Sequence, residues 1–473
     1  MRISGRSELA QYRLLNDAEI WLDGLPGRGT FVVYVHKRTG QQMTIQSAAA
    51  NHALPGAWAV LPGSRHAPVA EPIRRISSVY WVFALLLIFN IASPKAGILF
   101  FGIPLTFGYM LLGIFAPVAL IGLVRRPTLS PAAAANFFLG YLLAGLIVLY
   151  DTVFFSSAWT SVVTYLTIFI ILPMIILVAM SSHLEYVSEK DIGTVLKWCV
   201  RFVIVWGIMN FVLYALFKHI IEIKYVTVNA GELSSVFDKN NRRGSLMKLI
   251  STYNNGNVFG ASMIMLAPLY IYFEKSRFWI TALLIAVVLS LSRTAWFGLL
   301  AIGFLMVATG FIRLSRIYFW ISLIGAAGAG VVMMAVLGWD SSKLLDTNLG
   351  GRFEQWSDIE ISPLGQGSIR VAEILYAGLL RSFGVIGSLV VMVALLFPVV
   401  YAALNRQRLS RLRMAAAIGC GGYLLIAFFD AAFIYPPVIV IYLFASAMIY
   451  RRGYRLPSST PLSYHKASAA GPA

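Results

Sequence analysis

Long apolar runs separated by short polar segments occupy most of the chain after residue 78. Several runs reach about 18 residues, the length at which an apolar helix can cross roughly 30 Å of hydrocarbon. The pattern predicts an all-α polytopic membrane protein with about twelve transmembrane helices. Pro94 and Pro104 interrupt the region 79–124, where a re-entrant segment is the alternative to two helices. The predicted helices span residues 79–94, 101–124, 132–150, 158–180, 193–217, 256–273, 277–291, 294–312, 317–338, 383–404, 413–429 and 435–450.

Two parts of the chain flank this apolar region. Residues 1–76 contain no apolar run of the kind found in a signal peptide. Within them, residues 29–46 alternate like two short strands around an Arg-Thr-Gly turn. We therefore expect a small β-rich cytoplasmic N-terminal segment at 1–76, a transmembrane domain at 77–452 and a flexible cytoplasmic tail at 453–473.

Composition agrees with a lipid-covered surface. The chain is 59% hydrophobic and 12% charged, whereas soluble domains carry about 25% charged residues. The net charge of +18 comes mostly from Lys and Arg in short loops between apolar runs. That distribution indicates membrane topology rather than nucleic-acid binding, and it makes membrane lipids the expected anionic partners.

Basic residues also predict the orientation of the helices. If the N-terminus is cytoplasmic, every inside loop and the start of the tail are basic, as the positive-inside rule requires. This agreement favours an even number of helices, with both termini in the cytoplasm and the protein in a bacterial inner membrane. The residues concerned are Arg125, Arg126, Lys190, Lys275, Arg277, Arg313, Arg316, Arg406, Arg408, Arg411, Arg413, Arg451 and Arg452.

Two long loops, at 218–255 and 339–369, are predicted on the opposite, periplasmic side. The first breaks the charge rule, because its Lys and Arg residues outnumber its carboxylates. It is either a solvated loop with incidental charge or a site for an anionic group. Its charged residues are Lys218, Lys224, Lys239, Arg242, Arg243 and Lys248, with Glu222, Glu232 and Asp238.

Arg293 follows a tight break between two apolar runs, in the sequence Ser290-Leu291-Ser292-Arg293. The predicted topology places it at the periplasmic membrane boundary. An arginine there snorkels to water or meets an anion. Its planar, permanently charged guanidinium suits phosphate oxygens, so we expect it to bind phosphate.

The second long loop contains a glycine-rich turn between two arginines, Arg352 and Arg370. Gly365 and Gly367 permit positive φ or a close backbone approach. After the turn, Arg370, Glu373 and Tyr376 would share one face of a helix over 369–381. Glu373 could then act as a general base, or it could form a structural ion pair with Arg370.

Metal and nucleotide chemistry have no support in the sequence. It has no His-x-x-x-His pattern, no cysteine cluster and no phosphate-binding Walker loop. Cys199 and Cys420 lie inside apolar runs, where cysteine packs as a small hydrophobe. We expect neither a metal nor another cofactor. Asp430, predicted to end a helix, is either an interfacial group or part of a site.

Taken in order, the motifs resemble the O-antigen ligase and Wzy-type polysaccharide polymerase superfamily over about residues 240–400. The resemblance rests on their order and on their placement at one membrane face. The matching segments are Arg243-Gly244, Asn254-Asn255-Gly256-Asn257, Ser290-Leu291-Ser292-Arg293-Thr294-Ala295, Arg352 to Trp356, Pro363-Leu364-Gly365-Gln366-Gly367 and Tyr376 to Gly387.

The resemblance implies a GT-C-like, metal-independent glycosyltransferase that takes a glycan from undecaprenyl pyrophosphate at the periplasmic face. It also implies that Arg293 and Arg242 or Arg243 hold the pyrophosphate, with Arg352 near the site. Asn257, Arg370 and Tyr376 are further candidates for substrate binding. A chain-length-regulating co-polymerase is the protein partner that such a family implies.

One departure from the family pattern affects the predicted activity. Ligases have a His-Asn pair after the glycine-rich turn and a Glu before the later glycines, whereas this chain has Glu373, Ile374 and Ser382 there. The usual ligase base is therefore missing. The sequence favours an exopolysaccharide polymerase with Glu373 as the base, ahead of a ligase for another acceptor and of a polysaccharide or lipid transporter or flippase.

Overall fold

The computed structural model divides into two compact units, Met1–Arg74 and Arg75–Ala473, and each is described by itself. In the first unit, strands β1 to β4 form an antiparallel sheet in sequence order. Strands β3 and β4 fall in the segment where the sequence predicts two strands. The strands are β1 Ala10–Leu14, β2 Ala18–Gly24, β3 Phe31–Lys37 and β4 Gln42–Gln46. The structure describes residues 10–14, 18–24, 31–37, 42–46, 78–100, 103–125, 129–154, 159–227, 241–243, 246–312, 328, 354–357, 359–365, 374–430, 432–433 and 435–451.

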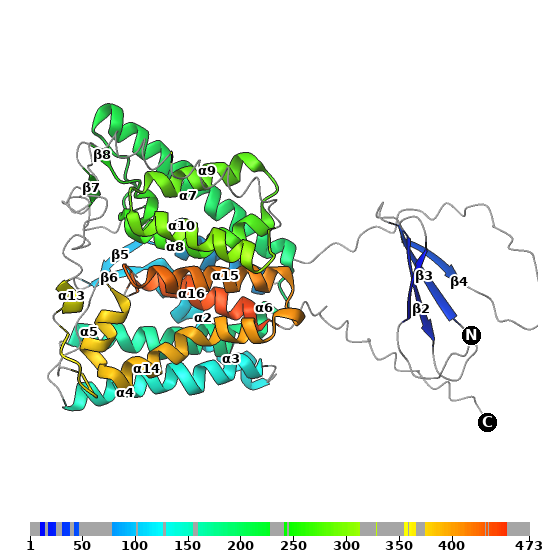
Figure 1. The fold of residues 1–473 in the computed structure, drawn as a ribbon, viewed down its shortest axis with the longest axis horizontal. Helices are drawn as coiled ribbons and strands as arrows, with labels where there is room; N and C mark the ends of the chain where they lie inside the picture. The colour runs from blue at the N-terminus through cyan, green and yellow to red at the C-terminus, as the bar shows by residue number, and fades with distance from the viewer. Residues whose placement is uncertain are drawn as a thin grey trace, which may run out of the picture. The chain divides into compact units, whose positions relative to one another are not determined.

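The second unit is a bundle of apolar helices that run roughly side by side (Figure 1). Several helices contain π-helical turns, labelled η1 to η4, that continue the α-helix before them. The elements up to residue 217 are α1 Ser78–Leu87, η1 Ile88–Ala92, β5 Gly97–Phe100, β6 Ile103–Thr106, α2 Phe107–Arg125, α3 Pro131–Asn136, η2 Phe137–Tyr141, α4 Leu142–Phe154, α5 Trp159–Leu166, η3 Thr167–Ile171, η4 Met174–Met180, α6 Ser181–Leu184 and α7 Glu189–Phe217. They are followed by β7 Arg242–Arg243, β8 Leu246–Met247, η7 Ser251–Tyr253, α8 Gly256–Phe273, α9 Arg277–Leu289, α10 Arg293–Ala308, α13 Glu354–Ser357, α14 Leu375–Leu404, η8 Arg406–Arg408, α15 Arg411–Ile426 and α16 Pro436–Tyr450.

Among the described residues, five helices are long and apolar enough to cross a membrane. This part of the chain therefore has the construction of a helical membrane protein. Shorter apolar helices accompany these five, so the count of twelve and the GT-C-like arrangement stay predictions. The five spans are Pro131–Asp151, Val162–Met180, Glu189–Phe217, Gly256–Phe273 and Leu375–Leu404.

The predicted start of the second helix is wrong. The segment predicted to begin a helix at 101 starts with the hairpin of β5 and β6, and α2 begins only at Phe107. A Cβ on Gly97 would lie 2.3 Å from the Leu105 carbonyl oxygen, so the hairpin requires glycine there. The helix predicted at 383–404 corresponds to the part of α14 after its kink at Gly384, and the part before the kink begins at Leu375. The helix predicted at 317–338 lies outside the described residues, apart from residue 328.

Helix α8 lies at the centre of the bundle, and most of its side chains are buried. It packs closely on α15, where a Cβ on Gly419 would lie 2.1 Å from the Met265 carbonyl oxygen. Small residues allow such backbone approach in membranes, where van der Waals packing drives helix association. This packing fixes α8 relative to α10 and α15.

The bundle has two ends that differ in their loops. At the basic end, three arginines donate to backbone carbonyls of a loop or of helix ends: Arg451 to Val187 at 2.5 Å, Arg413 to Ile449 at 2.6 Å and Arg406 to Thr309 at 2.8 Å. The other end, which we call the loop end, contains the hairpins β5–β6 and β7–β8 (Figure 1).

Candidate functional site

Helices α8, α10 and α14 begin at the loop end, and α15 ends there. The first turns of α8 and α10 pack closely, since a Cβ on Gly260 would lie 2.6 Å from the Ala295 Cβ. The first turns of α8, α10 and α14 contain no acidic side chain. A helix N-terminus carries about half a positive charge. Since these first turns contain no carboxylate, no acidic side chain within them offsets that charge.

Local turns fix the starts of α8 and α10. Asn255 caps α8, because its Oδ1 accepts from the Asn257 backbone N–H at 2.8 Å. Ser292 caps α10, because its Oγ accepts from the Ala295 N–H at 3.4 Å. Leu291, just before that cap, has a φ of 49°, an uncommon conformation for a residue with a branched side chain. The tight break seen in the sequence is therefore a left-handed turn that orients Arg293.

Lys248 is the least expected residue at this end, since it is 2% exposed. Its Nζ donates to Asn257 Oδ1, 3.2 Å away. Its side chain lies over Gly256, where a Cβ would come within 2.8 Å of the Lys248 Cβ. The ammonium is therefore held against the first turn of α8.

The Lys248 segment lies against the turn that leads to Arg293. The Leu249 N–H donates to the Leu289 carbonyl at 2.9 Å. A Cβ on Gly256 would also lie 2.9 Å from the Ser290 carbonyl oxygen. Two cations, the buried Lys248 and the half-buried Arg293, thus accompany two adjacent helix N-termini. Cations at helix N-termini are the reverse of what the helix dipole favours, but the arrangement suits a bound anion.

Tyr376 and Asp430 belong to the same end. The Tyr376 hydroxyl donates to the Leu424 carbonyl at 2.7 Å and so joins α14 to α15. The Phe297 ring on α10 contacts Phe429, with ring centroids 5.3 Å apart. Asp430 is 7% exposed and lies beyond the last residue of α15, Ile426. The prediction that Asp430 ends a helix is therefore wrong, because α15 ends four residues earlier, at Ile426.

The glycine-rich turn docks on a kink in α14. Gly365 has a φ of 92°, as expected for a turn that requires glycine, and Gly384 has a φ of 64°. Val385 and Ile386 donate their N–H groups to the carbonyls of Ser362 and Pro363, at 3.0 and 3.1 Å. A Cβ on Gly384 would lie 2.3 Å from the Gly365 nitrogen. Both glycines are required for this contact.

Several predicted site residues cannot be placed as side chains. Arg352, Arg370, Glu373 and Gly367 lie outside the described residues. For Arg242 and Arg243 the structure gives the backbone of strand β7 and no side-chain position.

The shared helical face predicted for Arg370, Glu373 and Tyr376 is described only at Tyr376, because Arg370 and Glu373 lie outside the described residues. Ile374, the N-cap residue of α14, has an extended backbone with φ −88° and ψ 120°. Helix α14 therefore begins at Leu375, and Tyr376 lies in its first turn. The prediction of a helix over 369–381 missed this boundary, because the apolar spacing continues through it.

Of the predicted site residues, the structure places Asn257 in hydrogen-bond contact with Lys248, and it places the turn that leads to Arg293 against the start of α8. The sequence pointed to an unusually basic loop, but nothing in the pattern separated Lys248 from its other cations. Within the described parts of the chain, no group of three or more His, Cys, Asp or Glu side chains could hold a metal ion.

No family model matches the chain, and no curated protein matches its sequence.

Proposed function

We propose that this protein is an exopolysaccharide polymerase of the inner membrane. It would act as a metal-independent glycosyltransferase that joins oligosaccharide repeat units carried on undecaprenyl pyrophosphate. The observation that carries the proposal is the pair of cations, Lys248 and Arg293, at the adjacent starts of α8 and α10.

This arrangement suits a pyrophosphate leaving group. In the reaction, an acceptor hydroxyl attacks the anomeric carbon of the donor glycan, and the bond from that carbon to the pyrophosphate oxygen breaks. Negative charge grows on the departing pyrophosphate. Fixed cations and helix N-termini stabilise that charge most strongly in the transition state. Arginine can supply such stabilisation without a divalent metal.

The acceptor hydroxyl must lose a proton to a base within hydrogen-bond reach. Glu373 is our candidate, and it precedes the N-cap residue of α14 at the loop end. Arg242 or Arg243, Arg352 and Arg370 are candidates for further contacts with the pyrophosphate or the glycan. A Glu373→Gln variant that makes polymer normally at wild-type protein level would exclude Glu373 as the base.

The decisive experiment uses a strain that lacks the gene. Its lipid-linked glycans and secreted polymer are compared by mass spectrometry with those of strains carrying wild-type, Arg293→Ala or Arg293→Lys protein. We expect single repeat units to accumulate on undecaprenyl pyrophosphate, with polymer lost in both variants, because lysine lacks the bidentate fork. Arg408→Ala, which removes an exposed arginine at the basic end, is the matched control.

The alternative functions predict different amounts of lipid-linked glycan and secreted polymer in the deletion strain. Full-length glycan accumulating on its lipid carrier would indicate a ligase. Unchanged glycan pools in the deletion strain would indicate a transporter of another compound. Full activity of Arg293→Lys would contradict a bidentate phosphate contact.

A further inference from the structure

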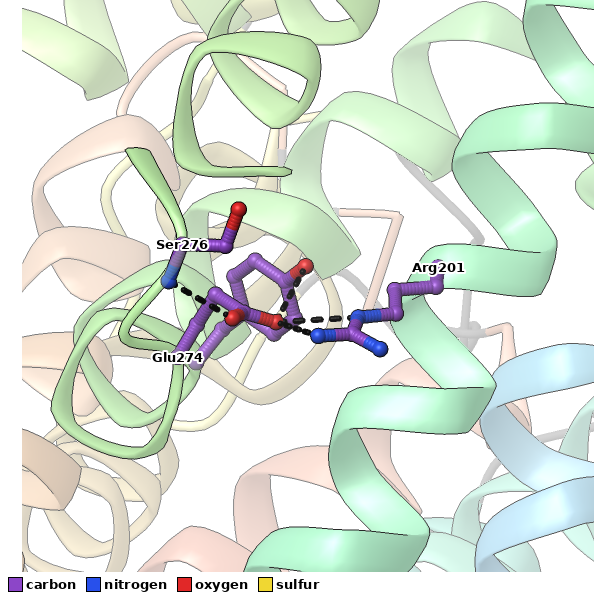
Figure 2. A network of polar contacts seen from close by, with 4 residues as sticks. Arg201, Glu274 and Ser276 are labelled. Carbon is purple, nitrogen blue, oxygen red and sulfur yellow. Dashed lines mark hydrogen bonds and ion pairs between the residues drawn. The ribbon is translucent and has the colours of Figure 1, made fainter. Parts of the chain in front are cut away.

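The basic end contains an ion pair that joins helix α7 to the end of helix α8. Arg201 of α7 donates from Nε and Nη2 to Glu274 Oε2, at 2.9 and 2.7 Å. The other carboxylate oxygen accepts from the Ser276 backbone N–H at 2.9 Å. The Tyr270 hydroxyl lies 3.4 Å from Oε2. Figure 2 shows that both Glu274 oxygens are engaged by these donors.

The guanidinium is only partly used by this pair. Among the described residues, no group accepts a hydrogen bond from Arg201 Nη1. The Arg201 side chain is 22% exposed, whereas that of Glu274 is 3% exposed. Figure 2 shows Nη1 on the side away from Glu274. One edge of the guanidinium is thus open at the bundle surface, where a phosphate oxygen could accept from it.

Indole rings flank the guanidinium. Its Cζ lies 5.6 Å from the Trp198 ring centroid and 5.0 Å from that of Trp279. Trp198 and Phe278 are 66% and 71% exposed. Tryptophan and basic residues together mark the level of lipid headgroups, so this surface lies where headgroups meet acyl chains.

Positive charge exceeds negative charge around Arg201. Lys197 lies one turn before it on α7 and is near enough to help lower the pKa of Glu274. Lys275 and Arg277 are exposed in the α8–α9 loop and the first turn of α9. The carboxylate of Glu189, farther along α7, lies 3.4 Å from the Tyr272 hydroxyl. The four cations Lys197, Arg201, Lys275 and Arg277 therefore outnumber the two carboxylates of this region, Glu274 and Glu189, and Glu274 already accepts hydrogen bonds from Arg201 and Ser276.

We define the Arg201 junction as Lys197, Trp198, Arg201, Glu274, Lys275, Arg277 and Trp279. We propose that the Arg201 junction binds the phosphate of an anionic phospholipid such as cardiolipin or phosphatidylglycerol. The open guanidinium edge contacts a phosphate oxygen, and the surrounding cations favour a headgroup with net negative charge over a zwitterionic one. The acyl chains lie along the exposed rings of Trp198 and Phe278. The proposal does not depend on the polymerase function.

Native mass spectrometry of the full-length chain in detergent tests the proposal. Cardiolipin, phosphatidylglycerol or phosphatidylcholine is added at equal concentration. We expect a large fraction of the protein to carry bound cardiolipin or phosphatidylglycerol, and a several-fold smaller fraction to carry phosphatidylcholine. Lys275→Ala/Arg277→Ala keeps the Arg201–Glu274 pair and should lower anionic-lipid occupancy several-fold.

The matched control is Arg406→Ala/Arg408→Ala, which removes two exposed arginines from η8 at the same end. It should leave lipid occupancy unchanged. Equal loss in both double variants, no loss in either, or equal binding of phosphatidylcholine would overturn the proposal. Arg201→Lys, checked first for unchanged thermal unfolding, should also lower the occupancy of anionic lipid. A lysine ammonium that pairs with Glu274 has no second N–H edge to donate to the phosphate.

Discussion

Lys248 at the loop end is buried, whereas Arg201 at the basic end is partly exposed, and the groups that they contact differ. Lys248 donates to the neutral amide oxygen of Asn257, at the positively polarised start of α8. Arg201 donates twice to the carboxylate of Glu274, at the end of the same helix. One helix therefore has a cation at each end, in opposite electrostatic settings.

This difference in contacts indicates different roles for the two cations. A carboxylate neutralises Arg201 and ties α7 to the α8–α9 loop, so that pair serves structure first. Lys248 adds positive charge where the helix dipole is already positive, which stabilises an anion better than it stabilises the fold. Removing each cation should therefore affect different measurements.

The largest effect is expected on activity, from Lys248→Met. Methionine fills similar volume without charge, so we expect polymer synthesis to fall on the order of a hundredfold, as when one preorganised charge-stabilising donor is removed. The midpoint of thermal unfolding, Tm, should change by only a few degrees. Lys190→Met, an exposed residue in the first turn of α7, is the control. A variant that loses Tm in proportion to activity would assign Lys248 a structural role.

The next largest effect is expected on stability, from Arg201→Met. It leaves the buried Glu274 carboxylate without its ion-pair partner, which should cost about 3 kcal/mol of unfolding free energy. The double variant Arg201→Met/Glu274→Gln should recover part of that loss, as thermal unfolding in detergent would show. Polymer synthesis per folded molecule should stay within about twofold of wild type. A selective loss of activity would remove the contrast with Lys248.

A smaller effect is expected from Gly384→Ala at the loop end. Its φ of 64° and ψ of −167° are available almost only to glycine, so alanine should cost about 1–3 kcal/mol. The substitution should also displace the Pro363–Gly365 turn and reduce polymer synthesis. Gly303→Ala, in α10 with open space around it, is the control for an added methyl group and should leave both measurements near wild type. Equal effects of the two substitutions would exclude the docking contact.

The smallest effect is expected in the pH dependence of stability. Burial alone would raise the pKa of the Glu274 carboxyl, but the Ser276 N–H, the Arg201 guanidinium and the Lys197 charge lower it below the ordinary value of 4.5. A lowered pKa in the folded state gives stability that is present above pH 4.5 and is lost as pH falls through the folded pKa. The Tm of wild type and of Glu274→Gln should be measured at intervals of about half a pH unit. The difference between the two Tm values should shrink as the pH falls from 5 to 3. An advantage that is independent of pH would mean that the carboxylate charge does not stabilise the fold.

Helix type and approximate extent could be predicted from the sequence, because apolar runs of sufficient length have few alternatives in a membrane. The hairpin at β5–β6 and the docking of the Pro363–Gly365 turn on α14 could not be predicted in this way. Both depend on which backbone groups find partners in distant segments. Gly97 donates to the Tyr225 carbonyl at 3.2 Å, for example, and no local pattern encodes that contact.

The candidate site divides in the same way. Arg293 could be singled out from the sequence, because a charged residue directly after an apolar run is conspicuous. Lys248 could not, since it is one of several cations in a basic loop. Its burial depends on tertiary contacts, because its side chain lies over Gly256 and the neighbouring Leu249 donates to the Leu289 carbonyl.

The sequence by itself determined that this protein is built from apolar helices, since lipid is the only surrounding that can cover so little polar surface. It also placed Arg293 at the end of one of them. Only the tertiary structure decided that Lys248 and Asn257 lie beside the turn that leads to it, and that Arg201 and Glu274 pair 73 residues apart in sequence. Hydropathy acts on each segment separately, whereas these contacts depend on which helices pack together and at what height.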